Sequence, residues 1–94
     1  MMRGDVTPSE SIKMEFTKHA LHVMTERTIP IEWVERTVAK PALRASDPND
    51  PEIERFFRRV PEWGDRVLRV AVNTSVAPWR VVSVFFDRNA KGIL

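Results

Sequence analysis

Apolar residues recur at helical spacing in two consecutive segments within residues 16–38. The first stripe is Ala20, Leu21, Met24 and Thr28, and the second is Ile31, Val34 and Val38, with Trp33 and Thr37 beside it. Thr17 is a favourable N-cap for the first helix, because its hydroxyl accepts a hydrogen bond from a free backbone N–H of the first turn. Pro30 suits the opening of the second helix, and Pro41 ends it because the residue before a proline leaves the helical region. The pattern predicts two amphipathic helices joined by a sharp turn.

Alternating apolar and polar residues predict strands on both sides of the helices. Ile12, Met14 and Phe16 alternate with charged residues just before the first helix. A short candidate strand covers residues 42–46, and three longer candidates cover residues 53–60, 66–73 and 80–87. The acidic stretch 47–52 holds two prolines, which predict an irregular loop. Short connections favour an antiparallel meander, and the last candidate is apolar on both faces, so it is expected inside the sheet.

A single strand register buries the apolar face of every strand at once. The strand residues expected to face the helices are Ile12, Met14, Phe16, Leu68, Val70, Val72, Val82, Val84 and Phe86, and the helices are expected to contribute Leu21, Met24, Val34 and Val38. The predicted fold class is α+β, a two-layer arrangement with a helical hairpin on one face of an antiparallel sheet, in the order β-α-α-β-β-β with residues 42–46 as an additional short strand. Residues 1–11 are expected to form a flexible tail and residues 12–94 a single domain.

The amino-acid composition excludes several classes of protein. The chain has 94 residues and no cysteine, which excludes disulfides and thiolate metal sites and makes a cytoplasmic location the expectation. No stretch approaches the ~20 apolar residues of a membrane span, and the first residues do not resemble a signal peptide. Neither a glycine-rich phosphate loop nor a GxSxG motif occurs, so no cofactor is expected.

Arginine dominates the basic residues, eleven of the fifteen Lys and Arg being Arg. Its planar guanidinium suits bidentate contacts with phosphate. Phe56 and Phe57 directly precede Arg58 and Arg59 on one candidate strand, a mixture typical of proteins that bind single-stranded nucleic acid. Arg58, Arg59 and Arg69 are therefore the candidate RNA-binding residues. The alternatives are that the arginines only solvate a sheet face, and that a GC-rich genome favours arginine codons.

Both histidines lie in the first helical segment. His22 and Glu26 are four residues apart, and His19 and Glu26 are seven apart, which places each pair on one side of a helix. A carboxylate beside an imidazole favours its protonated form, as a general acid or base requires. The alternative is an ordinary surface pair with a histidine packed near the sheet. These residues lack the spacing of known zinc motifs, so no metal site is predicted.

Several motifs together resemble a known family. They are Thr17-Lys-His-Ala20, Glu26-Arg27-x-Ile29, Trp33-Val34, Pro41, the Asp47/Asp50 loop, Arg55-x-Phe57, Val67-Leu68-Arg69-Val70 and Val84-Phe85-Phe86-Asp87-Arg88. As a set, over about residues 12–92, they resemble the small bacterial domain of unknown function 4258. In element order that family is similar to the RelE/ParE and BrnT-like toxins of toxin–antitoxin operons. The resemblance implies a RelE-like domain.

The resemblance also implies a function and partners. It implies a toxin-type protein that binds RNA, either as a metal-independent mRNA endoribonuclease or by binding alone, with RNA or the ribosome as target and a small antitoxin-like protein encoded nearby as partner. The positions it marks are His19, Arg27, Arg69, Asp87 and Arg88. The chain departs from the toxin pattern because it has no tyrosine and no histidine in its last residues, and Val23 stands where the family frequently has arginine.

A cleavage mechanism follows if the protein is a nuclease. The candidate catalytic residues are His19, Glu26, Arg69 and Arg88. His19 or His22, tuned by Glu26, would act as acid or base, and the two arginines would hold the phosphate. The alternative function is a non-catalytic protein-interaction module on the same fold. The sequence leaves open which histidine matters and whether the protein is a homodimer.

Overall fold

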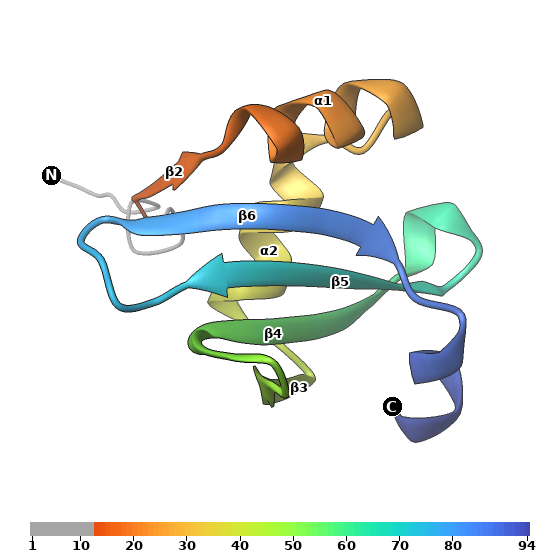
Figure 1. Ribbon diagram of the computed structural model, residues 1–94. Helices are drawn as coiled ribbons and strands as arrows, with labels where there is room; N and C mark the ends of the chain where they lie inside the picture. Colours follow the sequence, from red (N-terminus) through yellow and green to blue (C-terminus); the bar gives the residue numbers. More distant parts are fainter. Residues whose placement is uncertain (1–12) are drawn as a thin grey trace, which may run out of the picture.

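The computed structural model describes residues 13–94, apart from the side chain of Lys91. The predicted tail 1–11 and Ile12 lie outside this range. The elements are β2 (Met14–Phe16), α1 (Lys18–Arg27), α2 (Ile31–Ala39), β3 (Leu43–Asp47), β4 (Asp50–Val60), the 3₁₀ turn η2 (Pro61–Trp63), β5 (Arg66–Asn73), β6 (Trp79–Phe86) and the 3₁₀ turn η3 (Asn89–Ile93) (Figure 1). The predicted α+β class is confirmed, and the short strand expected near residues 42–46 is present as β3.

The five strands form one sheet in the order β2-β6-β5-β4-β3. Neighbours from β3 to β6 pair antiparallel, as the short connections predicted. β2 pairs with β6 in parallel, so the sheet is mixed rather than wholly antiparallel. The reason is that the chain passes through both helices before it returns to the sheet, and such a long crossover permits a parallel strand. β6 is an interior strand, as its two apolar faces predicted.

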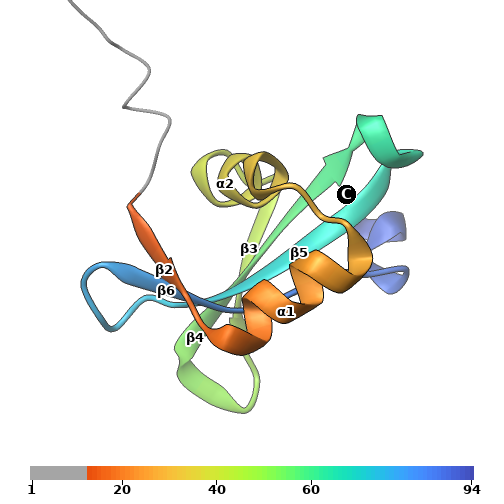
Figure 2. The same ribbon diagram turned by 90° about the horizontal axis from the view of Figure 1, so that it is seen from above.

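Both α-helices cover the same face of the sheet (Figure 2). α1 packs mainly on β6, and α2 packs on β5 and β4; each helix contacts the sheet more extensively than it contacts the other helix. The core between the layers consists of Ala20, Met24, Ile29, Val34, Val38, Phe56, Val60, Leu68, Val70, Val72, Val81 and Val84. The two-layer arrangement is therefore as predicted. None of the helices within residues 13–94 is long and apolar enough to cross a membrane.

The ends of the helices follow their local sequence. The hydroxyl of Thr17 accepts from the N–H of Ala20 at 3.1 Å, which confirms the predicted N-cap. Thr28 closes α1 in the left-handed conformation with φ of 55°. Pro30 caps the start of α2, and Lys40, before Pro41, ends it. The polypeptide therefore turns between the helices within three residues.

Two of the predicted core positions are wrong. Leu21 is 48 % exposed, because α1 lies over β6 and turns only the stripe of Ala20 and Met24 toward the sheet. Val81 is fully buried in place of Val82. The cause is a bulge: Ala71 lies opposite Ser83 but Val72 lies opposite Val81, so Val82 is an extra residue that shifts the alternation of β6.

The expectation of an irregular loop at residues 47–52 is also wrong. β4 begins at Asp50 and includes Pro51, so only Pro48 and Asn49 remain between the strands. The register shifts between Ser46 and Asp47, and this irregularity accommodates a residue without a backbone N–H. A proline at a bulge needs no ladder hydrogen bond.

The face of the sheet opposite the α-helices is covered at one end by η3. Ala90 and Leu94 pack there on Phe57, Val67 and Leu43. Phe56 is buried in the main core and Phe57 under η3, with 0 % and 6 % exposed. Neither phenylalanine is therefore exposed for base stacking, and both serve as packing residues on opposite sheet faces.

Candidate anion-binding site

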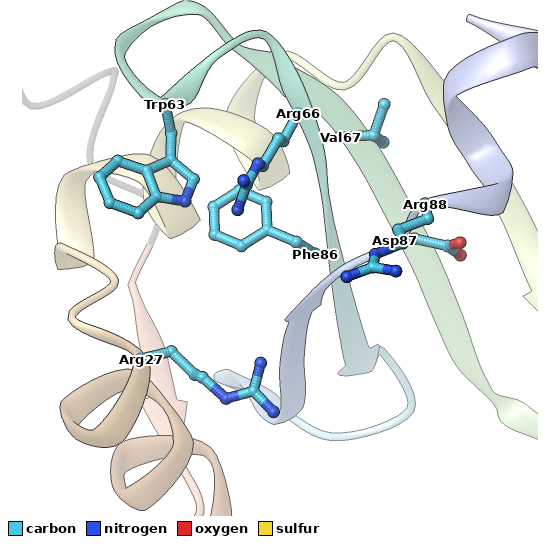
Figure 3. A pocket seen from close by; sticks show the side chains of 7 residues that line it. All are labelled: Arg27, Trp63, Arg66, Val67, Phe86, Asp87 and Arg88. Atoms are coloured by element: carbon cyan, nitrogen blue, oxygen red, sulfur yellow. The ribbon is translucent and has the colours of Figure 1, made fainter.

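A surface pocket lies where the end of α1, the turn η2, the start of β5 and the end of β6 meet (Figure 3). Its lining consists of Arg27, Trp63, Arg66, Val67, Phe86, Asp87 and Arg88, and its volume is about 480 Å³. Pockets that hold small ligands usually have ~300–1,000 Å³. We refer to it as the arginine pocket.

The antiparallel pairing of β5 and β6 brings two of these arginines to one end of the sheet. Leu68 lies opposite Phe86, and the N–H of Asp87 donates to the carbonyl of Val67 at 2.8 Å, so pairing continues just past β6. Arg66 precedes Leu68 by two residues in β5 and so shares its face of the sheet, the face that carries the helices. Arg88 follows β6 at the start of η3, and its guanidinium points into the same space (Figure 3). Arg27 enters the same space from the last turn of α1 (Figure 3).

The three pocket arginines have no acidic partner. Within residues 13–94, the side chains of Arg27, Arg66 and Arg88 form no ion pair and no hydrogen bond, and that of Arg66 has only a cation–π contact, 5.8 Å from the ring centre of Trp63. All other arginines of this range are engaged: Arg36 by Glu62, Arg44 by Glu54, Arg55 by Asp47, Arg59 by Asp65, Arg69 by Asp87, Arg80 by Glu15, and Arg58 by the carbonyl of Lys40. The arginines whose side chains have no ion pair and no hydrogen bond in the described part of the chain thus converge on one pocket.

Asp87 lines the pocket without neutralising it. Its carboxylate points away from the guanidinium groups, toward the other sheet face (Figure 3). There it lies 3.3 Å from Nη1 of Arg69 and accepts from the N–H groups of Asn89 and Ala90 at 2.9 and 3.3 Å. The chain leaves the strand at this point, since β6 ends at Phe86 and Arg88 has the helical backbone angles that begin η3, so these two neighbours in sequence point in different directions.

The other acids next to the pocket residues are engaged as well. Glu62 accepts two hydrogen bonds from Arg36, at 3.0 and 2.6 Å, and this contact lowers the pKa of Glu62 to about 2. Asp65, next to Arg66 in sequence, lies 3.2 Å from Nη1 of Arg59. Glu62 and Asp65 therefore leave the positive charge of the pocket uncompensated.

Aromatic rings form one wall of the site. Trp63 is 48 % exposed. Its ring lies 6.2 Å from that of Trp33, which in turn meets Phe86 edge-on at 6.4 Å. The Arg36–Glu62 pair joins η2 to α2 and so holds the segment that carries Trp63. The site therefore combines cations with an accessible aromatic surface.

Only one of the four candidate catalytic residues, Arg88, lines the pocket. His19 and Glu26 are exposed on α1 and are not part of the lining. The predicted pair of His22 and Glu26 is present, with 3.5 Å between Nε2 and Oε2, but both side chains are largely exposed. Arg69 stacks over Phe85 at 4.1 Å and pairs with Asp87 on the opposite sheet face.

The three candidate RNA-binding residues do not converge either. Arg58 and Arg59 are consecutive in β4, so their side chains leave opposite faces of the sheet. Arg58 donates to the carbonyl of Lys40 at 2.6 Å, and Arg59 contacts both Asp65 and the carbonyl of Leu94, each at 3.2 Å. Together with the Arg69–Asp87 pair, these contacts join elements of the fold.

The sequence analysis did not mark Trp63, which lies between two candidate strands, or Arg66, which begins one of them, as site residues. A signal was available, because arginine occurs at the start of one strand and just after the end of the next, and an antiparallel pair brings these two ends together. Within the part of the chain described here, no group of three or more His, Asp or Glu side chains could hold a metal ion.

The fold and the site define a small α+β protein with a cationic surface pocket. A family model described as a domain of unknown function (DUF4258) matches residues 16–86. Because the match covers most of the chain, the protein belongs to this family. No curated protein and no solved structure matches the chain.

Proposed function

We propose that the protein binds single-stranded RNA at the arginine pocket, as a toxin-type protein directed at RNA would. The observation that carries the proposal is the convergence of Arg27, Arg66 and Arg88 without an acidic partner among the described residues. Like charges held together repel one another and destabilise the fold, so such a cluster is expected where an anion binds. Guanidinium groups match the oxygens of phosphate in geometry.

The aromatic wall supports RNA over a simple inorganic anion. The exposed ring of Trp63 offers a surface on which a base can stack, beside the cations that would hold its phosphate. Bases reach such a ring only where the strand is unpaired, because a duplex keeps them stacked inside. The combination supports a single strand as the ligand.

The geometry supports binding more directly than cleavage. Metal-free cleavage of RNA needs a general acid and a general base beside the bound phosphate. Neither histidine lines the pocket, and the carboxylate of Asp87 is engaged by Arg69. Endoribonuclease activity, with His19 or His22 as acid or base, therefore stays a prediction. Incubation of one single-stranded RNA with the parent protein and with a His19→Ala, His22→Ala double variant tests it.

A binding assay tests the proposal. Each phosphate contact should contribute about −0.7 to the slope of log affinity against log salt for a single strand, so three contacts give roughly −2. Replacing Arg27, Arg66 and Arg88 by glutamine should remove most of that slope and most of the binding at low salt. Fluorescence anisotropy with a short labelled single-stranded RNA measures both quantities.

A matched control removes the same charge elsewhere. Lys13, Lys18 and Lys40 are exposed and lie outside the pocket lining, so their triple glutamine variant has the same net charge as the pocket variant. It should bind almost as well as the parent protein. Equal losses in both variants would mean that net charge alone attracts RNA. Absence of RNA binding at low salt would favour the alternative function, a protein-interaction module.

The proposed antitoxin-like partner is tested separately. Copurification of the protein with the product of a neighbouring gene would support it.

A further inference from the structure

The charge of the arginine pocket exceeds what one internal phosphate needs. Three guanidinium groups face one space, and each carries five N–H donors (Figure 3). An internal phosphodiester carries one negative charge and two free oxygens. A terminal phosphate carries about −1.5 to −2 charges at pH 7 and three strongly accepting oxygens. The terminal group therefore matches the number of cations and donors better.

The three pocket arginines also form a compact cluster rather than an extended row. Proteins that bind along the middle of a single strand present a continuous positive groove that follows the backbone. Here the arginines that would extend the pocket in other directions, Arg36, Arg59 and Arg69, each contact a carboxylate. Among the described residues, the one further arginine without a carboxylate partner is Arg58, whose guanidinium donates to the carbonyl of Lys40.

Trp63 lies where the nucleotide that carries such a phosphate would place its base. Its ring is close to the guanidinium of Arg66, and nearly half of the side chain is exposed. Phe86 lies near it in the lining of the pocket (Figure 3). Phosphate and base of one terminal nucleotide would therefore both have partners in the same pocket.

From this arrangement we infer that the arginine pocket binds the phosphorylated end of an RNA strand, in preference to an internal phosphodiester. The inference rests on the proposed RNA binding and adds the chemical group that is recognised. It applies to a phosphomonoester at either the 5′ or the 3′ end, because the cluster of guanidinium groups recognises the phosphate itself.

The test compares three single-stranded RNAs of one sequence that carry a 5′-phosphate, a 3′-phosphate, or hydroxyl groups at both ends. One of the phosphorylated strands should bind about tenfold more tightly than the hydroxyl-ended strand, as expected for one additional charge-assisted contact. The strand that gains affinity identifies which end is bound. Arg66→Gln and Arg88→Gln should each reduce this preference, and Lys40→Gln should leave it unchanged.

The outcomes separate this inference from the proposed function. Equal affinity for all three strands would overturn the recognition of a terminal phosphate and leave RNA binding intact. No binding of any strand would overturn both. A preference that survives in both arginine variants, with folding checked by circular dichroism, would place the terminal phosphate elsewhere and so also overturn the inference.

Discussion

At the scale of single residues, the partner of an arginine decides its role. Arg66 and Arg69 lie in the same strand, yet Arg66 is exposed without an acid and Arg69 is partly covered, over Phe85 and beside Asp87. Burial and the neighbouring Arg55 lower the pKa of Arg69 from its usual value, against the opposing effect of Asp87. Guanidinium remains charged nevertheless, so Arg69 needs its carboxylate and serves the fold.

Trp63 provides a prediction at this scale. Replacing Trp63 by leucine should weaken binding of single-stranded RNA by ~1–3 kcal/mol, because one stacked base loses its aromatic partner. Anisotropy titrations of the variant measure the loss, and Trp63→Phe should restore part of the affinity because it keeps a π face. Equal affinity of the leucine variant and the parent would show that no base stacks on Trp63.

At the scale of elements, ion pairs join segments that the backbone ladder does not connect. The pair of Arg36 and Glu62 links α2 to η2, and the pair of Arg59 and Asp65 links β4 to the turn before β5. The bulge at Val82 acts at the same scale, because one extra residue exchanges the faces of half a strand. These features orient Trp63 and β6 relative to the helices.

The Arg36–Glu62 pair predicts a dependence on pH. The pKa of Glu62 is about 2 in the folded protein, below the ordinary value of 4.5. Since the folded value is the lower one, the pair contributes its stabilisation above about pH 4.5 and loses it as the pH falls toward 2. An NMR titration of the Glu62 carboxyl group should show the low midpoint, and Arg36→Gln should return it toward the ordinary value. The same midpoint in both proteins would mean that Arg36 is not the cause.

At the scale of the whole molecule, charge is distributed unevenly although the net charge is only +2. Most arginines in residues 13–94 are neutralised locally by acids, while three that have neither an ion pair nor a side-chain hydrogen bond there meet at one end of the sheet. They come from residues 27, 66 and 88, which the antiparallel meander and the helical layer bring together. Such concentration favours ligand binding at some cost in stability.

Thermal unfolding should reveal that cost. The glutamine triple variant of Arg27, Arg66 and Arg88 should be as stable as the parent, or more stable by up to about 1 kcal/mol, because repulsion is relieved and no ion pair is lost. The triple variant of Arg58, Arg59 and Arg69 should be less stable, since it removes contacts with Lys40, Asp65 and Asp87. Calorimetry of both variants measures the difference. The reverse order would indicate that the pocket arginines support the fold.

The sequence by itself determined the features that depend on neighbours in the chain. The Thr17 cap, the stop at Pro41 and the alternation of Leu68, Val70 and Val72 were all predictable, because capping and side-chain direction are set within a few residues. The antiparallel meander followed from short connections. The spacing of His22 and Glu26 likewise predicted their contact.

Only the tertiary structure decided which charged groups meet. Which acid pairs with Arg59 or Arg69 depends on strand register and on the turn at the end of the sheet. The parallel pairing of β2 depends on a crossover through two helices. Burial of both Phe56 and Phe57 required a second layer, η3, on the far face. The arginine pocket is also decided by the tertiary structure. Its cations are distant in sequence, and they differ from the other arginines of the described structure in that their side chains have no ion pair and no hydrogen bond. Long-range packing creates that distinction, and local sequence does not encode it.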